Sequence, residues 1–320
     1  MRLKLVPGET NIPFMGVRKI TYVISVAALI LSAVMFFGQG LNKGIDFEGG
    51  IMIEVGTPEP ADLSKMRSLL GGLGLGEVAL QEFGKPEDVL IRVERQEGDS
   101  EAQNAAVLKV QAVLDKEIEG ISYRRVEFVG PKVSGELVEA AAWAVLTSVL
   151  VMLAYIWLRF EWQFSVGAVA ALVHDVMLTM GMFSITGIEF NLASVAALLT
   201  IVGYSINDTV VVYDRVRENL RKYKQLPLDE LLSKSVNETL ARTTMTSVTT
   251  LLALGALVVF GGEVIRGFAL AMTWGVVVGT YSSIFVAAPL LLLFGLKRGS
   301  REEFDEDGNR LTEEGFPADV

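Results

Sequence analysis

Six long apolar stretches dominate the pattern of hydrophobic and polar positions along this chain of 320 residues. Each is close to the 20 or so helical residues that are needed to cross a bilayer core. Four of the six contain no charged residue. The pattern predicts membrane-spanning helices at residues 20–38, 140–158, 164–187, 192–213, 243–262 and 267–296.

The first and last of these stretches need separate arguments. The apolar run at 20–38 is longer than the core of a secretory signal, and Phe37 to Gly40 form a poor cleavage site, so we expect a retained helix. The stretch at 267–296 is too long for a straight perpendicular span. We therefore expect it to tilt, or to kink at Pro289.

A different pattern fills residues 42–136, which are too many and too regular for a loop. Short runs of alternating apolar residues predict strands, and two longer runs with helical spacing, at 63–73 and 107–118, predict helices. Their order is β-α-β-β-α-β, which is the order of ferredoxin-like folds and indicates no particular chemistry. The predicted fold is thus an all-α bundle of six transmembrane helices with an inserted α+β ferredoxin-like extracytoplasmic domain.

Positive charge is distributed unevenly between the two sides that these helices define. Sixteen Lys or Arg residues fall in segments 1–19, 159–163, 214–242 and 297–320, whereas the short loops on the opposite side contain only Arg266. Because positive residues mark the cytoplasmic side, the N-terminal tail 1–19, the loop 214–242 and both termini are predicted to be cytoplasmic. Residues 42–136 then face the periplasm. The tail 297–320 is strongly acidic, and we expect it to be disordered.

Composition narrows the chemistry further. The chain has no cysteine and one histidine, which excludes disulfides, thiolate nucleophiles and most histidine-based metal sites. It contains no phosphate-binding loop, and its net charge of −10 argues against nucleic acid as a partner. We therefore expect a protein that is not an enzyme, needs no cofactor and obtains its energy from an ion gradient or a partner.

Charged side chains inside a membrane span cost several kcal/mol and are therefore functional candidates. Asp208 lies within roughly 10 Å of the cytoplasmic end of the fourth predicted helix, at 1.5 Å per residue. Arg242 begins the fifth helix at the same end. The two side chains are expected to share a depth and to hydrogen-bond. A static ion pair that only fixes helix register is the alternative.

Other polar residues in these helices are secondary candidates. His174 and Asp175 lie near the middle of the third helix, where satisfied core groups are the alternative reading. Hydroxyl residues from Thr243 to Thr250 recur on one face of the fifth helix, which favours either close packing or a pathway. Gly275 and Gly279 have the spacing of a helix-packing motif. The secondary candidates are Asn207, His174, Asp175, Asp214, Thr246 and Ser247.

Several longer strings are more specific than any single charge. In chain order they are Gly44-Ile45-Asp46-Phe47-Glu48-Gly49-Gly50, Gly130-Pro131-Lys132-Val133-Ser134, His174-Asp175-Val176, Leu199-Thr200-Ile201-Val202-Gly203-Tyr204-Ser205-Ile206-Asn207-Asp208-Thr209, Val210-Val211-Val212-Tyr213-Asp214-Arg215-Val216-Arg217-Glu218-Asn219 and Ala241-Arg242-Thr243-Thr244-Met245-Thr246-Ser247. With these strings the chain resembles, from about Leu5 to Lys297, the SecF family of smaller subunits in the bacterial SecD-SecF complex.

The resemblance implies membership of the resistance-nodulation-division superfamily and a place in the bacterial inner membrane. It implies SecD, the SecY-SecE-SecG channel, YajC and a translocating polypeptide as partners. It also implies that the proton gradient is used to assist protein export. The acid and arginine that the family carries inside the membrane correspond, by their flanking strings, to Asp208 and Arg242.

These expectations lead to a mechanistic hypothesis with two competitors. Motion of Arg242 toward or away from Asp208 would switch the protonation of the carboxyl group and would be coupled to movement of the 42–136 domain. One alternative is half of a proton-driven small-molecule exporter. The other is a scaffold of the channel that transports nothing.

Overall fold

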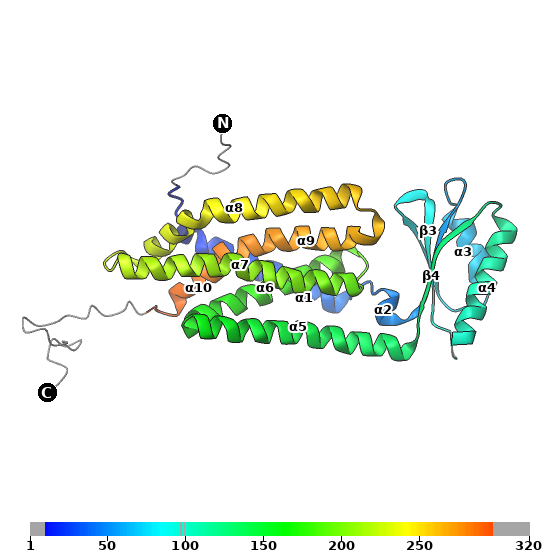
Figure 1. Ribbon diagram of the computed structural model, residues 1–320, viewed down its shortest axis with the longest axis horizontal. Helices are drawn as coiled ribbons and strands as arrows, with labels where there is room; N and C mark the ends of the chain where they lie inside the picture. The colour runs from blue at the N-terminus through cyan, green and yellow to red at the C-terminus, as the bar shows by residue number, and fades with distance from the viewer. Residues whose placement is uncertain (1–9, 97, 99, 297–320) are drawn as a thin grey trace, which may run out of the picture.

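The computed structural model describes residues 10–96, 98 and 100–296. It consists of an elongated helical bundle with a small α+β domain at one end (Figure 1). The bundle therefore has a domain end, beside that domain, and a far end, where the chain enters its first helix. The prediction of a disordered acidic tail at 297–320 lies outside the described residues.

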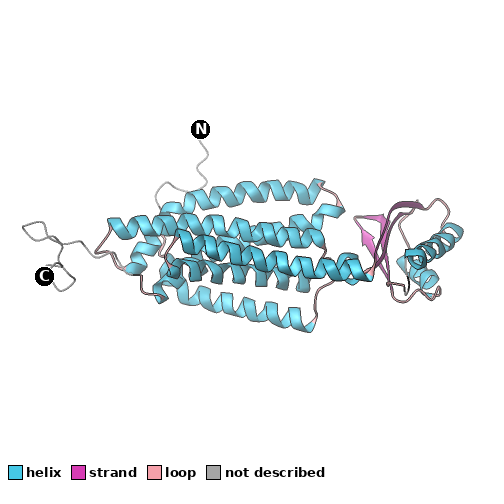
Figure 2. Ribbon diagram, turned by 60° about the horizontal axis from the view of Figure 1, so that its bottom comes forward, coloured by secondary structure: helices cyan, strands magenta, loops and turns pink. Residues whose placement is uncertain are grey.

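Within the described chain, six helical segments are long and apolar enough to cross a membrane, as predicted. Figure 2 shows them running side by side along the bundle. Five are single helices, and the sixth combines α9, the π-helix η2 and α10. Their bounds are α1 (Arg18–Gly38, preceded by the 3-10 turn η1, Phe14–Val17), α5 (Pro131–Arg159), α6 (Trp162–Thr186), α7 (Leu192–Lys222), α8 (Leu228–Phe260), α9 (Glu263–Ser282), η2 (Ser283–Ala287) and α10 (Ala288–Leu293).

The outer surface of the bundle carries many apolar side chains, as a surface facing lipid requires. On α1 the buried residues are the small hydroxyl residues Thr21, Ser25 and Ser32, whereas Val23 and Phe37 are 69% and 83% exposed. Helices α6, α7 and the α9 segment are mostly buried, and α1, α5 and α8 surround them. The sixth predicted span contains the π-helix η2, a wider turn that ends two residues before Pro289.

Two predicted boundaries were wrong. Most of the segment 214–242, predicted as a loop, is helical, because α7 continues to Lys222 and α8 already begins at Leu228. The two extensions bury Val216, Leu231 and Leu232 against the bundle, and this apolar stripe is hidden among charges in the sequence. Residues 131–136 belong to α5 and not to the α+β domain, because Pro131 occupies the first turn of a new helix.

The α+β domain contains the predicted order of elements. They are α2 (Ile45–Glu48), which precedes the sheet, then β1 (Gly50–Gly56), α3 (Leu63–Gly71), β2 (Val78–Phe83), β3 (Lys85–Val93), α4 (Ser100–Glu117) and β4 (Ser122–Val129). The four strands form one antiparallel sheet in the order β2-β3-β1-β4. Ile51, Ile53 and Val55 alternate into a core beneath α3 and α4, and all three are fully buried.

Close packing between α7 and α9 depends on two glycines. A Cβ atom at Gly275 would overlap the Ile201 side chain, and one at Gly279 would lie 3.2 Å from Ser205 Cβ. The absence of side chains therefore lets the two helix backbones approach, which confirms the predicted packing role.

We expect Gly275→Ala to lower the free energy of unfolding by about 1–3 kcal/mol, because the added methyl group must displace Ile201 or separate the helices. Gly203→Ala is the matched control, since a Cβ atom there meets no atom within 4 Å. Unfolding of the two purified variants in detergent measures the difference. Equal stability would show that α7 and α9 tolerate the methyl group.

Candidate functional site

Asp208 on α7 is a buried carboxylate with little hydrogen bonding. Its side chain is 2% exposed. Asn207 Nδ2 donates to its Oδ1 over a long 3.5 Å, and Oδ2 is buried with no hydrogen-bond partner in the described chain. An unsatisfied buried oxygen is costly. A proton or an incoming donor would satisfy it.

Arg242 and Thr246 on α8 face this carboxylate. The Arg242 guanidinium is close enough to act on Asp208 through its charge, but no ion pair within 4.0 Å joins the two among the described residues. Arg242 and Asn207 are both exposed on the surface of this single chain. The Thr246 hydroxyl donates to the Thr243 carbonyl oxygen at 2.9 Å. The structure thus places acid and arginine near each other without direct contact.

Ser247, another hydroxyl residue of the predicted stripe, contacts α9. Ser247 Oγ and Thr280 Oγ1 are 2.7 Å apart, and Ser247 also donates to the Thr243 carbonyl at 2.9 Å. Thr250 donates to the Thr246 carbonyl at 2.8 Å. Ser247 therefore serves contact between helices, and Thr246 is the member of the predicted stripe that faces Asp208.

Asp175 forms a second buried centre, separate from Asp208. The residue is 1% exposed and joins three helices. Its Oδ2 accepts hydrogen bonds from Ser205 Oγ of α7 at 2.5 Å and from Ser282 Oγ of α9 at 2.7 Å. Its Oδ1 is 2.9 Å from Nδ1 of the adjacent His174. Both oxygens of this carboxylate are thereby satisfied, in contrast to Asp208.

His174 places its ring between this centre and a groove on the bundle surface. The ring stacks on Tyr281 with centroids 6.0 Å apart, and Nε2 is buried with no hydrogen-bond partner among described atoms. Tyr281 in turn donates to the Thr21 carbonyl of α1 at 3.0 Å. A largely apolar groove of about 470 Å³ lies beside these groups, between α1, α6 and α9.

Sequence reasoning missed Ser205 and Ser282, which complete the Asp175 centre. Both offered a signal: Ser205 stands one helical turn before Asp208, and Ser282 and Ser283 interrupt a long apolar run just before Pro289. The wide turn of η2 begins directly after Ser282. π-Helical turns are frequent at functional sites. The Asp175 centre therefore lies directly beside a turn of this kind.

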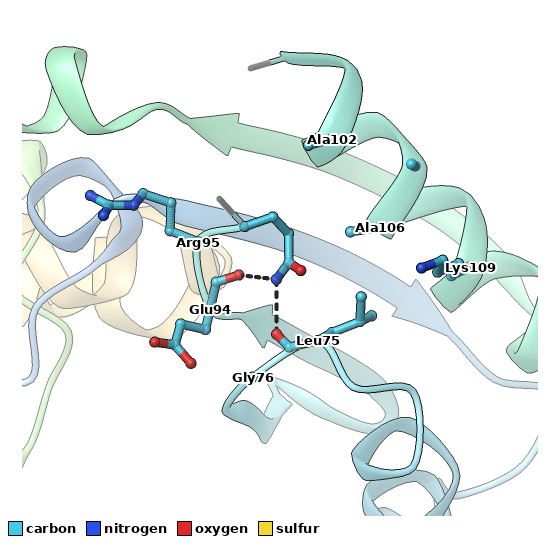
Figure 3. A pocket seen from close by; sticks show the side chains of 9 residues that line it. Leu75, Gly76, Glu94, Arg95, Ala102, Ala106 and Lys109 are labelled. Atoms are coloured by element: carbon cyan, nitrogen blue, oxygen red, sulfur yellow. Dashed lines mark hydrogen bonds between the residues drawn. The ribbon is translucent and has the colours of Figure 1, made fainter. Parts of the chain in front are cut away.

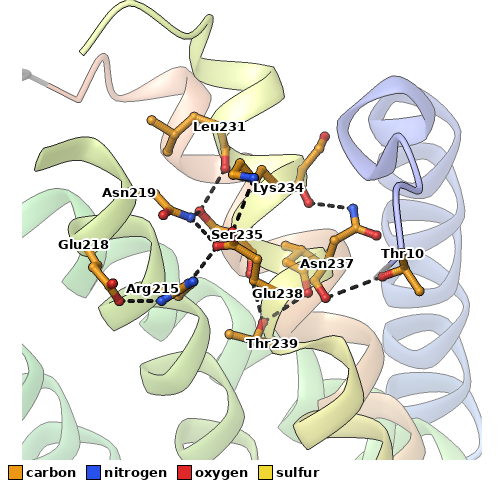
Figure 4. Close-up of polar contacts among 12 residues, drawn as sticks. Thr10, Arg215, Glu218, Asn219, Leu231, Lys234, Ser235, Asn237, Glu238 and Thr239 are labelled. Atoms are coloured by element: carbon orange, nitrogen blue, oxygen red, sulfur yellow. Dashed lines mark hydrogen bonds and ion pairs between the residues drawn. The ribbon is translucent and has the colours of Figure 1, made fainter. Parts of the chain in front are cut away.

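Asp214 lies apart from both centres. It pairs with Arg159 at 3.2 Å, and both side chains are nearly half exposed at the far end of the bundle. Nearby, Arg215 and Asn219 of α7 bind Glu238 of α8, each at 2.7 Å (Figure 4). This charged surface ties the two helical extensions together and contains no buried carboxylate comparable to Asp208.

The first described residues, from Thr10 onward, contact the same end of α8. Asn237 donates through Nδ2 to the Ile12 carbonyl at 2.8 Å and accepts from the Ile12 amide at 2.9 Å. Thr10 also reaches the Asn237 carbonyl (Figure 4). Phe14 and Met15 follow and are buried against the bundle. The Asn237 side chain therefore both donates to and accepts from the backbone of Ile12, as the backbone of a neighbouring strand would.

A hollow of about 490 Å³ in the α+β domain lies between the end of β3 and α4 (Figure 3). Gln96 crosses it and donates to the Leu75 carbonyl at 2.8 Å and the Glu94 carbonyl at 2.7 Å. The Gln96 side chain thus joins the end of β3 to the loop before β2. The hollow lies in a different unit from the buried carboxylates.

Six membrane-length helices, ionisable side chains inside their bundle and an inserted α+β domain define a polytopic membrane protein. The family model "Protein export membrane protein SecD/SecF, C-terminal" matches residues 109–297, and the "SecD/SecF GG Motif" model matches residues 34–57. The chain belongs to the SecD/SecF family of protein-export membrane proteins.

Individual relatives agree with this assignment. The chain is 47% identical to the protein translocase subunit SecF of Rickettsia bellii, over 92% of this chain and 97% of that protein. It is 48% identical to SecF of Rhodobacter capsulatus over 96% of both chains. Its fold is similar to the crystal structure of SecDF, a translocon-associated membrane protein from Thermus thermophilus, with a TM-score of 0.82 and 37% identity. That match covers 91% of this chain and 39% of SecDF.

Replacing Asp175 by alanine should lower the free energy of unfolding by about 1–3 kcal/mol or more, because Ser205, Ser282 and His174 lose their shared partner inside the bundle. Asp214→Ala is the control and should cost no more than about 1 kcal/mol, since its ion pair is exposed. Denaturation of both variants in detergent gives the comparison. Similar losses for the two would contradict a structural centre at Asp175.

Proposed function

We propose that this chain is the proton-coupled half of a SecD-SecF complex that assists polypeptide translocation. The observation that carries the proposal is Asp208, a carboxylate buried in a membrane-length helix with one unsatisfied oxygen and a guanidinium nearby. Ionisable groups in such positions mark proton relays and ion pathways. The SecF and SecDF relatives supply the biological context of export.

Arg242 is the group that would control Asp208. Its guanidinium acts on the carboxylate through charge, yet it makes no direct ion pair there and is exposed on this chain. A guanidinium that moves closer favours the carboxylate, and one that moves away favours the protonated acid. Proton binding and release at Asp208 would thereby follow a displacement between α7 and α8.

SecD is the proposed partner that completes the site. Asn207 and Arg242 are exposed on membrane-length helices, where contact of these polar groups with lipid would be unfavourable. Transporters of this general type combine two helical halves, and the chain covers 39% of the SecDF of Thermus thermophilus. We extend the proposal to the SecY-SecE-SecG channel, YajC and the translocating polypeptide as further partners.

The proposed location is the bacterial inner membrane, with the far end of the bundle in the cytoplasm. Arg159, Arg215 and Arg217 lie at that end, which is consistent with the preference of positive residues for the cytoplasmic side. Both termini would be cytoplasmic and the α+β domain periplasmic. Its β-α-β-β-α-β order and its β2-β3-β1-β4 sheet support a ferredoxin-like class.

Movement of the α+β domain is proposed to be coupled to the proton step. A second solved structure, SecDF in a super-membrane-facing form, matches at 35% identity over the same 91% of this chain but with a TM-score of 0.65. The two SecDF structures therefore differ from each other in arrangement. In this proposal the chain is not an enzyme, and a proton gradient supplies the work.

Asp208→Asn should reduce gradient-driven export to the level measured without a gradient, because the amide cannot bind and release a proton. The measurement is translocation of a preprotein into vesicles that contain SecD and the channel. Asp214→Asn, on the same helix but in an exposed ion pair, should retain wild-type export. Wild-type export by the Asp208 variant would contradict the proposal and favour a passive scaffold.

Arg242→Lys should leave only part of the gradient-driven export, since an ammonium group is a poor substitute for a planar guanidinium fork. Copurification with SecD in mild detergent provides the assembly control. If assembly persists and export is unchanged, the geometry of Arg242 plays no part. Export of a small molecule in place of polypeptide would instead support the exporter alternative.

A further inference from the structure

The string Gly44 to Gly50 lies where the α+β domain meets the bundle, at the opposite end of α7 from its proposed cytoplasmic extension, and is not part of the proposed proton site. Residues 42–44 run beside the loop between α6 and α7. The Phe190 amide donates to the Asn42 carbonyl at 2.7 Å, and the Gly44 amide donates to the Phe190 carbonyl at 2.9 Å. Lys43 and Phe190 thus form an isolated β-bridge, and residues 42–46 and 187–192 around it are called here the junction.

Asp46 connects this junction directly to α7. Its Oδ2 accepts a hydrogen bond from the Leu192 amide, the first residue of α7, at 2.9 Å. Asn191 caps the same helix end through a reciprocal bond with Ser194. A carboxylate at a helix N-terminus also interacts favourably with the helix dipole. Residues 39–49 between α1 and β1, called here the linker, therefore supply a cap to the helix that carries Asp208.

Aromatic packing and a close approach stiffen the junction. Phe47 stacks on Phe190 at 5.6 Å, and Phe190 meets the fully buried Phe183 edge-on at 5.2 Å. A Cβ atom at Gly44 would overlap the Glu189 carboxylate, so a larger residue there would push Glu189 aside. The linker is thus held against the bundle at Gly44 and Phe47.

A second attachment comes from the sheet. Arg92 of β3 forms an ion pair with Glu189 and donates to Asn42 Oδ1 at 3.1 Å. Arg92 lies on the sheet face opposite α3 and α4, next to Leu90 and Met52, which pack with Ile45 of the linker. A single attachment would leave the domain free to turn about its linker. A second attachment at a separate point restricts that motion.

We infer that Asp46, Arg92 and Glu189 are positioning residues that transmit displacement of the α+β domain to α7. Asp208 follows Leu192 by 16 residues on one uninterrupted helix, roughly 24 Å at 1.5 Å per residue. A domain that turns or lifts pulls on the first turn of α7 through Asp46 and on the preceding loop through Glu189. The inference rests on the proposed proton step at Asp208 and assigns its mechanical input.

A charge exchange tests the sheet attachment. The chain has no cysteine, so spin labels at Ser68→Cys on α3 and Thr249→Cys on α8 report the distance between domain and bundle. Arg92→Glu or Glu189→Arg alone should broaden that distance distribution and lower gradient-driven export several-fold. The double variant, with the charges exchanged, should restore both. Arg125→Glu and Glu127→Arg, in an exposed pair on β4 that stays within the domain, are the controls and should change neither.

A matched pair of caps tests the α7 attachment. Asp46→Asn weakens the cap on α7, and Asp62→Asn weakens an equivalent cap on α3, where Asp62 accepts from Ser64 and Lys65 at 3.0 Å. Asp46→Asn should speed hydrogen exchange of the amides at the start of α7 and lower gradient-driven export several-fold. Asp62→Asn should affect only α3.

The inference is overturned if the charge reversals leave the label distances unchanged, or if the distances change while export stays at the wild-type level. It is also overturned if Asp46→Asn and Asp62→Asn behave alike in export. Asp208→Asn in the same vesicles reads the proposed function separately. Normal export by that variant refutes the proton step itself, whatever the junction variants do.

Discussion

A carboxylate enclosed by helices in hydrocarbon needs donors from its neighbours, and that need organises this bundle. Asp175 obtains its donors from Ser205 and Ser282, so that α6, α7 and α9 are held at one depth. The outer helices then pack around these three central ones. Asp208 is buried on the same α7 but lacks equivalent donors. One carboxylate is thus suited to holding structure, and the other is left available for chemistry.

α7 is fixed at several heights by contacts of different kinds. Asp46 and Asn191 cap its first turn, Asp175 binds Ser205 near its middle, and Glu238 of α8 binds its extension beyond the apolar part. Close contact with α9 fills the space between. Asp208 therefore sits on an element whose position is set at both ends. A helix held in this way moves as a unit or not at all.

The sequence was sufficient for the number of spans and for the order of elements in the α+β domain, because apolar length and periodicity report burial directly. It was not sufficient where burial is shared between distant segments. The helical extensions beyond Asp214 carry an apolar stripe among many charges, and periodicity alone did not reveal it. Asp175 was recognised as a candidate, but its serine partners stand on other helices. The positions of Asp208 and Arg242 in the sequence predicted that the two side chains lie near each other. They did not predict that the side chains stay too far apart for an ion pair within 4.0 Å.

The pairing of Asn237 with Ile12 has a consequence for the order in which parts of the protein fold. The two residues are 225 positions apart, and the N-terminal segment has no equivalent backbone partner until α8 has been synthesised. At 5–20 residues per second, that delay is roughly 10–45 s. Residues 10–12 are therefore synthesised well before the side chain that pairs with them. This contact can form only after α8, the fifth long helix, has been synthesised.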